Sequence, residues 1–265
     1  MITIDVCMET VLPALPLLDR AAPIAQAGFK TVELWFPELH LPNCECPKLR
    51  AACDKAGLRI NNIVLNSPDG GIGGSLTAAG DRAKYLERLN SSLKCCEDLG
   101  VKMMITCTGN VQQGVTRAAQ RRNMVETLKA AGDVAGKAGV TLVVEPLNSL
   151  VDHQGYFLDD PYDAADIVRQ VGHPNIGLLF DVYHMQIMHG NVIETIRDCM
   201  DVIRHFHSAG VPGRHELDSG ELDYPRIVQT IADMGYSGCF GLEYFPAEDS
   251  ARSLKRMRQL LADRN

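Results

Sequence analysis

The stretch I-G-L-L-F-D-V-Y-H-M-Q, from Ile176 to Gln186, has the pattern of a buried strand that ends on a carboxylate. Five uncharged residues precede Asp181, and His184 follows three positions later. A buried charge is costly for folding unless it is paired or bound to a metal ion. The stretch therefore predicts a strand whose C-terminal end lies at a rim or in a functional site.

Segments of this strand type alternate with helical segments along the whole chain. The clearest helical periodicity lies in Tyr85–Leu99 and Gln120–Ala138, and Gly often stands between a helix and the next strand, as in A-G-L-R and L-G-V-K. The strands are predicted at Ile2–Met8, Thr31–Phe36, Arg59–Asn66, Met103–Cys107, Thr141–Glu145, Ile176–Asp181, Ile203–Ser208 and Cys239–Glu243. Eight β–α units in 265 residues predict an α/β fold, a single (β/α)8 TIM barrel domain over residues 1–265. A doubly wound open sheet is the structural alternative.

Composition and charge narrow the class of protein. The chain is 46% hydrophobic and 22% charged, which fits a soluble globular protein with a sizeable core. Its net charge of −7 and the lack of any basic cluster longer than Arg121–Arg122 argue against nucleic acid as a partner. No apolar run reaches the roughly 18 residues of a membrane span, and the start M-I-T-I-D-V has no basic segment. Nine scattered cysteines without a C-x-x-C pair predict free thiols, and we expect a cytoplasmic protein without membrane contact.

One Gly-rich segment, S-P-D-G-G-I-G-G-S at Ser67–Ser75, follows the third predicted strand. It lacks both the G-x-G-x-x-G pattern and the lysine of a phosphate-binding loop. We expect a mobile loop over the barrel mouth rather than a phosphate cradle.

The last four predicted strands each carry one side chain of the metal-ligand type near the C-terminal end. These side chains are Glu145, Asp181, His207 and Glu243, and the gaps between them are 36, 26 and 36 residues, each near one β–α unit. The active site of a barrel lies at the C-terminal ends of its strands. Three clustered carboxylates would not all ionise unaided, so a divalent cation is expected among them. Three oxygens and one imidazole suit Mg²⁺ or Mn²⁺ and tolerate Co²⁺ or Zn²⁺.

Two further residues are candidates for substrate binding. His184 lies near the predicted metal ligand Asp181, and Arg214 lies in V-P-G-R-H-E after the seventh strand, on the same face of the barrel. An arginine there could grip an anionic or hydroxylated substrate. Ordinary structural roles are expected for the remaining polar candidates, which are His40, His153, His173, His189 and Asp198.

At these residues the chain resembles the hydroxypyruvate isomerase family, within the xylose isomerase-like barrels. The segments that carry the resemblance run from about Leu18 to Pro246: L-D-R-A-A-P-I-A-Q-A-G-F-K-T-V-E-L-W-F-P, V-V-E-P-L-N, F-D-V-Y-H-M-Q-I-M-H-G, V-P-G-R-H-E-L-D-S-G-E-L-D-Y and G-L-E-Y-F-P. The resemblance implies isomerisation of the aldose–ketose type at a metal, with Glu145 and Glu243 as ligands that also transfer protons and with Asp181 as the metal aspartate. The fourth ligand position falls on His207, in H-F-H-S-A-G, where hydroxypyruvate isomerases often carry Gln and ketose 3-epimerases carry His.

The reaction predicted from this chemistry is proton transfer through an enediolate. One of Glu145 and Glu243 removes a proton from the carbon next to the carbonyl of a small hydroxy-carbonyl substrate, and the same residue or the other returns one to the neighbouring carbon. Conversion of hydroxypyruvate to tartronate semialdehyde, or a related isomerisation of a 2-oxo acid or sugar, is the first hypothesis. The alternatives are a ketose 3-epimerase or an inosose dehydratase-like lyase at the same site, an endonuclease IV-like nuclease, and a non-catalytic barrel. Analogy with related barrels leaves a homo-oligomer open, with Trp35 and Phe36 as exposed contact candidates.

Overall fold

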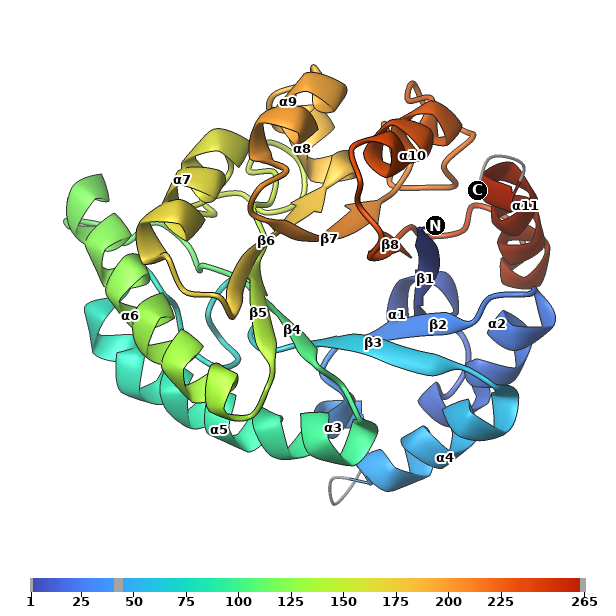
Figure 1. Ribbon diagram of the computed structural model, residues 1–265, viewed down its shortest axis with the longest axis horizontal. Coiled ribbons are helices and arrows are strands. Elements are labelled where there is room, and N and C mark those ends of the chain that lie inside the picture. Colours follow the sequence, from blue (N-terminus) through green and yellow to red (C-terminus); the bar gives the residue numbers. More distant parts are fainter. Residues whose placement is uncertain (1, 41–44, 263–265) are drawn as a thin grey trace.

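The computed structural model describes residues 2–40 and 45–262, and its eight parallel strands close into a barrel in the order β1 to β8. Figure 1 shows the helices as an outer ring around this barrel, with β1 and α11, the first strand and the last helix, on the same side of the view. The strands are β1 (Thr3–Cys7), β2 (Thr31–Leu34), β3 (Arg59–Val64), β4 (Met103–Thr106), β5 (Thr141–Val144), β6 (Ile176–Asp181), β7 (Ile203–Ser208) and β8 (Cys239–Leu242). The predicted (β/α)8 barrel is therefore confirmed, and the open sheet is excluded because β1 pairs with both β2 and β8.

The helices follow the strands in the order of a barrel. They are α1 (Met8–Val11), α2 (Ala21–Gln26), α3 (Pro37–His40), α4 (Cys46–Ala56), α5 (Arg82–Leu99), α6 (Arg117–Lys137), α7 (Pro161–Val171), α8 (Val182–Met188), α9 (Val192–Cys199), α10 (Tyr224–Asp233) and α11 (Ser250–Ala262), with short 3₁₀ turns at Leu17–Asp19 and Ala79–Asp81. Left-handed glycines end α4 and α5, at Gly57 (φ 70°) and Gly100 (φ 71°), as the sequence predicted. In the part of the chain that the structure describes, no helix is long and apolar enough to cross a membrane.

Several predicted strands extend one or two residues beyond the observed ones. Glu145 and Glu243, for example, follow the last residues of β5 and β8. Their backbone N–H groups still donate to the neighbouring strands, from Glu145 to Thr106 O at 3.1 Å and from Glu243 to Ser208 O at 3.0 Å. The backbone of both residues is thus fixed at the C-terminal rim of the barrel, although the regular strand pairing has ended.

Two hydrophobic layers hold the barrel. The larger one lies between the sheet and the helices and contains most of the buried aliphatic and aromatic side chains. A separate small cluster consists of Val64, Ile105, Val143 and Leu179. Strand alternation places these four on the inward face, because each stands two residues before a residue of the C-terminal rim.

The cysteines that the structure describes are all free and buried, as expected from their spacing, and Cys44 lies outside the described residues. The side chain of His40 is likewise outside the described part. The Gly-rich segment forms turns after β3, held where Asn66 Nδ2 donates to Gly74 O at 3.0 Å, and its Pro68 lines the pocket at the barrel mouth. The position of this loop matches the prediction, and its predicted mobility stays a prediction.

Candidate active site

The four predicted metal ligands meet at the C-terminal end of the barrel. One ligand atom each from Glu145, Asp181, His207 and Glu243 lies within 4.8 Å of the other three. All four side chains are buried. Strand register explains the meeting, since Asp181 on β6 stands beside His207 on β7. The spacing along the sequence therefore correctly located one cluster from four strands.

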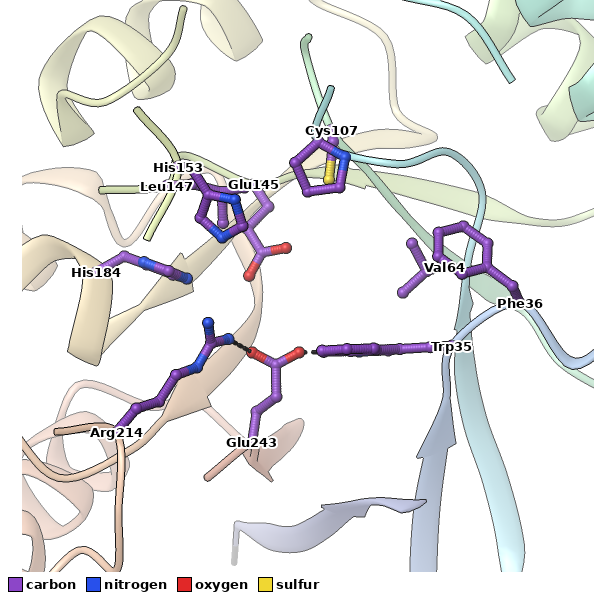
Figure 2. Close-up of a pocket in the computed structure, with 11 residues that line it drawn as sticks. Trp35, Phe36, Val64, Cys107, Glu145, Leu147, His153, His184, Arg214 and Glu243 are labelled. Atoms are coloured by element: carbon purple, nitrogen blue, oxygen red, sulfur yellow. Dashed lines mark hydrogen bonds and ion pairs between the residues drawn. The ribbon is translucent and has the colours of Figure 1, made fainter. Parts of the chain in front are cut away.

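Each carboxylate is held in a different way. Asp181 caps the N-terminus of α8, and its Oδ1 accepts from Tyr183 N at 2.7 Å. Glu243 accepts from Arg214 Nη2 at 2.6 Å through Oε2 and from Trp35 Nε1 at 3.0 Å through Oε1 (Figure 2). Glu145 Oε1 is buried and accepts no hydrogen bond from the described residues. One acid is thus clamped, while the other presents a bare oxygen to the cluster.

The electrostatics of the cluster follow from these contacts. Burial, together with the charges of Glu243 and Glu145, raises the pKa of Asp181 to about 7. Burial also raises the pKa of Glu145. Burial opposes ionisation of Glu243 as well, but His207 and Arg214 outweigh it and lower the pKa of Glu243 to about 2. In the absence of a cation, Glu243 is therefore ionised, whereas Asp181 and Glu145 resist ionisation beside it.

The residues present fit a bound divalent cation. His207 Nδ1 lies 3.3 Å from Glu145 Oε1 and 3.5 Å from Glu243 Oε2, and this nitrogen has no hydrogen-bond partner among the described residues. Buried polar atoms without partners are rare in folded proteins. Three carboxylates and one imidazole form a mostly hard donor set, which suits Mg²⁺ or Mn²⁺.

A pocket of ≈ 210 Å³ opens beside this cluster. Figure 2 shows Trp35, Phe36 and Val64 on one side and His184 and Arg214 on the other. Glu145 and Glu243 also line it. The volume is below the range of about 300–1,000 Å³ that is common for drug-sized ligands, so the pocket fits a small molecule.

The two predicted substrate-binding residues both face the pocket. His184 Nδ1 accepts from Asn148 Nδ2 at 2.7 Å and from Asn148 N at 3.2 Å, so the ring proton is on Nε2, which lies 3.5 Å from Asp181 Oδ2. Burial, and next the charge of Arg214, holds the pKa of His184 well below its usual range. His184 is therefore a neutral donor. Arg214 has a left-handed backbone (φ 58°) and a buried Nε without a partner among the described residues.

Comparison with known proteins agrees with this architecture. The family model described as "Xylose isomerase-like TIM barrel" matches residues 21–260. A Homo sapiens protein named "Putative hydroxypyruvate isomerase" is 35% identical over 93% of this chain and 90% of its own. The chain belongs to the hydroxypyruvate isomerase family of xylose isomerase-like TIM barrels. A 2-oxo-tetronate isomerase of Cupriavidus necator is another relative, 33% identical over 92% of this chain and 93% of its own.

A solved structure extends the likeness to three dimensions. The crystal structure titled "AP endonuclease, family 2" from Brucella melitensis superposes with a TM-score of 0.88 at 28% identity, covering 96% of this chain and 97% of that one. The barrel fold is thus shared over nearly the whole length of this member of the isomerase family.

Sequence reasoning missed several residues of the site. Trp35 and Phe36 were named only as exposed candidates for an oligomer contact, whereas both are partly exposed and line the pocket, and the oligomer contact itself stays a prediction. His153 was expected to be structural, yet it lines the pocket with its ring centroid 5.4 Å from that of His184. Asn148 orients His184. One sequence signal could have indicated Trp35, because it stands just beyond a buried strand, at the end of the barrel where the active site lies. It has no side chain of the metal-ligand type and therefore did not stand out.

Proposed function

We propose that this protein is a metal-dependent isomerase that interconverts a small hydroxy-ketone and hydroxy-aldehyde, with hydroxypyruvate and tartronate semialdehyde as the first pair. The observation that carries the proposal is the meeting of four ligand atoms within 4.8 Å at the rim of a small pocket. The names of the relatives support it, because hydroxypyruvate and 2-oxo-tetronate are both small 2-oxo acids.

Glu145, Asp181, His207 and Glu243 would hold one divalent ion, Mg²⁺ or Mn²⁺ by preference, with Co²⁺ or Zn²⁺ tolerated. When bound, the ion would polarise the substrate carbonyl and offset the negative charge that develops on its oxygen. Arg214 has a spare N–H donor in the pocket wall, which suits the carboxylate or hydroxyl groups of the substrate. His184 Nε2–H is a second donor on the same side (Figure 2).

Proton transfer falls most naturally to Glu145. Its Oε1 accepts no hydrogen bond from the described residues, whereas Glu243 is clamped by Arg214 and Trp35 and stays ionised. Glu145 would take a proton from the carbon next to the carbonyl and, after exchange with solvent, deliver one to the former carbonyl carbon, while a proton passes from the substrate hydroxyl to the former carbonyl oxygen. Glu243 would provide fixed negative charge. If Glu243 also delivers a proton from its own side, the same apparatus would epimerise a ketose at C3.

The test starts from protein stripped with a chelator. Calorimetric titration with Mn²⁺ and Mg²⁺ should give one site per chain, and Glu145→Gln and Glu243→Gln should weaken it. Glu145→Gln should also lower kcat on hydroxypyruvate by about 10²–10⁴-fold. Reaction in D₂O followed by NMR should show solvent deuterium at the carbon next to the carbonyl. Glu194→Gln, at an exposed glutamate of α9, is the matched control and should change neither quantity.

The outcomes separate the alternatives. Turnover of ketoses to their C3 epimers without turnover of hydroxypyruvate would replace the isomerase with an epimerase on the same site. Wild-type protein that binds no divalent ion, with variants that lose only stability, would show a structural polar cluster. The expected small-molecule partner, the absence of nucleic acid from the partners and the cytoplasmic location stay predictions beside this proposal.

A further inference from the structure

Glu33 lies beneath the candidate metal site and was not singled out by the sequence. It stands on β2, two residues before Trp35, and is 1% exposed. Its Oε2 lies 2.8 Å from Asn62 Nδ2, 2.9 Å from His205 Nε2 and 3.2 Å from His207 Nε2. One buried carboxylate oxygen thus faces three nitrogen atoms, one of which belongs to a candidate metal ligand.

The ring of His207 connects this buried layer with the candidate metal site. Its Nε2 faces Glu33, and its Nδ1 faces Glu145 and Glu243 at 3.3 and 3.5 Å. A histidine that binds a metal ion does so as a neutral imidazole, which has one N–H donor and one lone pair. With the hydrogen on Nε2 donated to Glu33, the lone pair of Nδ1 points into the cluster of carboxylates.

The neighbouring strand β8 leaves room for the contact between Glu33 and His207. Gly241 pairs with His207 in the ladder between β7 and β8. A Cβ atom at Gly241 would lie 2.6 Å from Glu33 Oε1 and 2.8 Å from His207 Cδ2. A side chain there would displace the carboxylate or the ring.

We propose that Glu33 is a positioning residue that fixes the orientation and the Nε2–H tautomer of His207, so that Nδ1 is presented to the divalent ion. The inference rests on the proposed function, because it requires an ion among Glu145, Asp181 and Glu243. Histidines that bind metals usually donate their other N–H to a carboxylate or carbonyl, which orients the ring and raises its basicity. Here that carboxylate comes from β2, on the half of the barrel that provides none of the four candidate ligands.

A second metal ion held by Glu33, His205 and His207 is the competing explanation of the same atoms, since these three could also form a ligand group. Asn62 argues against it, because its Nδ2 is a donor without a lone pair and lies 2.8 Å from the same oxygen of Glu33. A hydrogen-bonded network accounts for that contact, and a cation would be repelled by it. Titration should therefore give one ion per chain, and two would overturn the inference.

The first experiment compares Mn²⁺ affinity by calorimetry in chelator-stripped wild type, Glu33→Gln and Asp5→Asn. Glu33→Gln should raise the dissociation constant about 10–100-fold. Asp5→Asn also removes a carboxyl group that is buried on the inward face of β1. Asp5 acts on Glu33 and His207 only through its charge, and no hydrogen bond or ion pair joins it to His207 among the described residues, so the affinity should stay within about threefold of wild type. Thermal unfolding of each apo protein monitors the fold.

A double-mutant cycle separates positioning from a general structural effect. His207→Gln keeps a side chain that can bind a metal through oxygen but removes the imidazole. If Glu33 acts through the ring, Glu33→Gln should cost little further affinity in the His207→Gln background. Equal losses in both backgrounds would show that Glu33 only supports the barrel, and would overturn the inference.

A spectroscopic readout needs no variant. In the Co²⁺-loaded wild type, ¹H NMR in H₂O should show one exchangeable, hyperfine-shifted imidazole N–H that exchanges slowly, from Nε2 of His207. Absence of this signal would overturn the inference even if Glu33→Gln fails to fold. If wild type binds the metal and Glu33→Gln binds it with the same affinity, only this inference is overturned. If wild type binds no ion, the proposed function is overturned as well.

Discussion

The inside of the barrel just below the candidate site has two unlike halves. On the side of β3 to β6, Val64, Ile105, Val143 and Leu179 form a buried aliphatic cluster. On the side of β1, β2, β3 and β7, the corresponding layer is polar and fully buried, and it consists of Asp5, Glu33, Asn62 and His205. Asp5, Glu33 and His205 stand two residues below the rim, as the four aliphatic residues do, and Asn62 lies one inward position deeper on β3, two residues before Val64. The two halves therefore differ mainly in residue type.

The difference indicates what each half does for the rim above it. The aliphatic half packs beneath Glu145 and Asp181 and fixes their strands by shape. The polar half reaches His207 directly through Glu33, and it contains buried atoms that lack partners among the described residues, such as both Asp5 oxygens and Glu33 Oε1. The aliphatic half should therefore contribute mainly to stability. The polar half should lower stability but orient the candidate metal ligand His207.

The largest expected effect is in the aliphatic half. Leu179→Ala removes a fully buried side chain from the cluster and should lower the free energy of unfolding by about 2–5 kcal/mol, because the rigid barrel wall cannot collapse into the cavity. Chemical denaturation of the apo protein measures it. Leu150→Ala is the control, since Leu150 is 64% exposed and should change stability by less than about 0.5 kcal/mol. Similar small changes in both variants would mean that the aliphatic half does not carry the stability assigned to it.

A steric change at the junction of β7 and β8 should come next. Gly241→Ala places a methyl group 2.6 Å from Glu33 Oε1 and 2.8 Å from His207 Cδ2, so overpacking should cost about 1–3 kcal/mol and weaken Mn²⁺ binding as the ring shifts. Gly177→Ala in β6 is the matched control, because its added carbon is also crowded, at 2.4 Å from Arg204 Cγ and 3.3 Å from Val202 O, but would meet neither Glu33 nor His207. Calorimetric titration with Mn²⁺ measures the affinity of both variants. Equal affinities would show that the contact between Glu33 and His207 does not affect metal binding.

The fold was predictable because its signals are repeated. Each β–α unit carries its own strand pattern and its own helix stop, such as Gly57 and Gly100, so errors of one or two residues at strand ends did not change the topology. The four candidate ligands were predictable for the same reason, since each occupies an equivalent position on consecutive strands.

The remaining part of the site was not predictable in the same way. Glu33 stands in T-V-E-L, a strand whose four residues are all buried, and nothing local distinguishes a buried glutamate that contacts His207 from one at a solvated rim. The contact spans 174 residues of sequence and exists only because the barrel closes. Trp35 depends likewise on closure, because its partner Glu243 is 208 residues away.

Asp5 allows a test of how much the buried polar half lowers the free energy of unfolding. Burial, and next the charge of Glu33, raises the pKa of Asp5 well above its usual value. Between the unfolded and the folded pKa, the folded state binds more protons than the unfolded state, so this group makes stability fall as pH rises. Asp5→Asn should therefore stabilise the protein by about 1–2 kcal/mol at pH 7–8, and the gain should vanish below about pH 4. Thermal unfolding of both proteins across this pH range measures it, and a pH-independent difference would contradict the assignment.

The smallest expected effect is at the edge between the halves, where Trp35 packs against the aliphatic cluster and also donates to Glu243 at 3.0 Å. Trp35→Phe keeps an aromatic wall and removes the N–H donor. Because a hydrogen bond to a charged group contributes about 1.5–3 kcal/mol, kcat/KM should fall about tenfold. Steady-state kinetics should compare kcat/KM of Trp35→Phe with that of Arg214→Met, because Arg214 donates to the other oxygen of Glu243 at 2.6 Å. If Trp35→Phe leaves kcat/KM unchanged, Arg214 alone positions Glu243, and the wall formed by Trp35 only shapes the pocket.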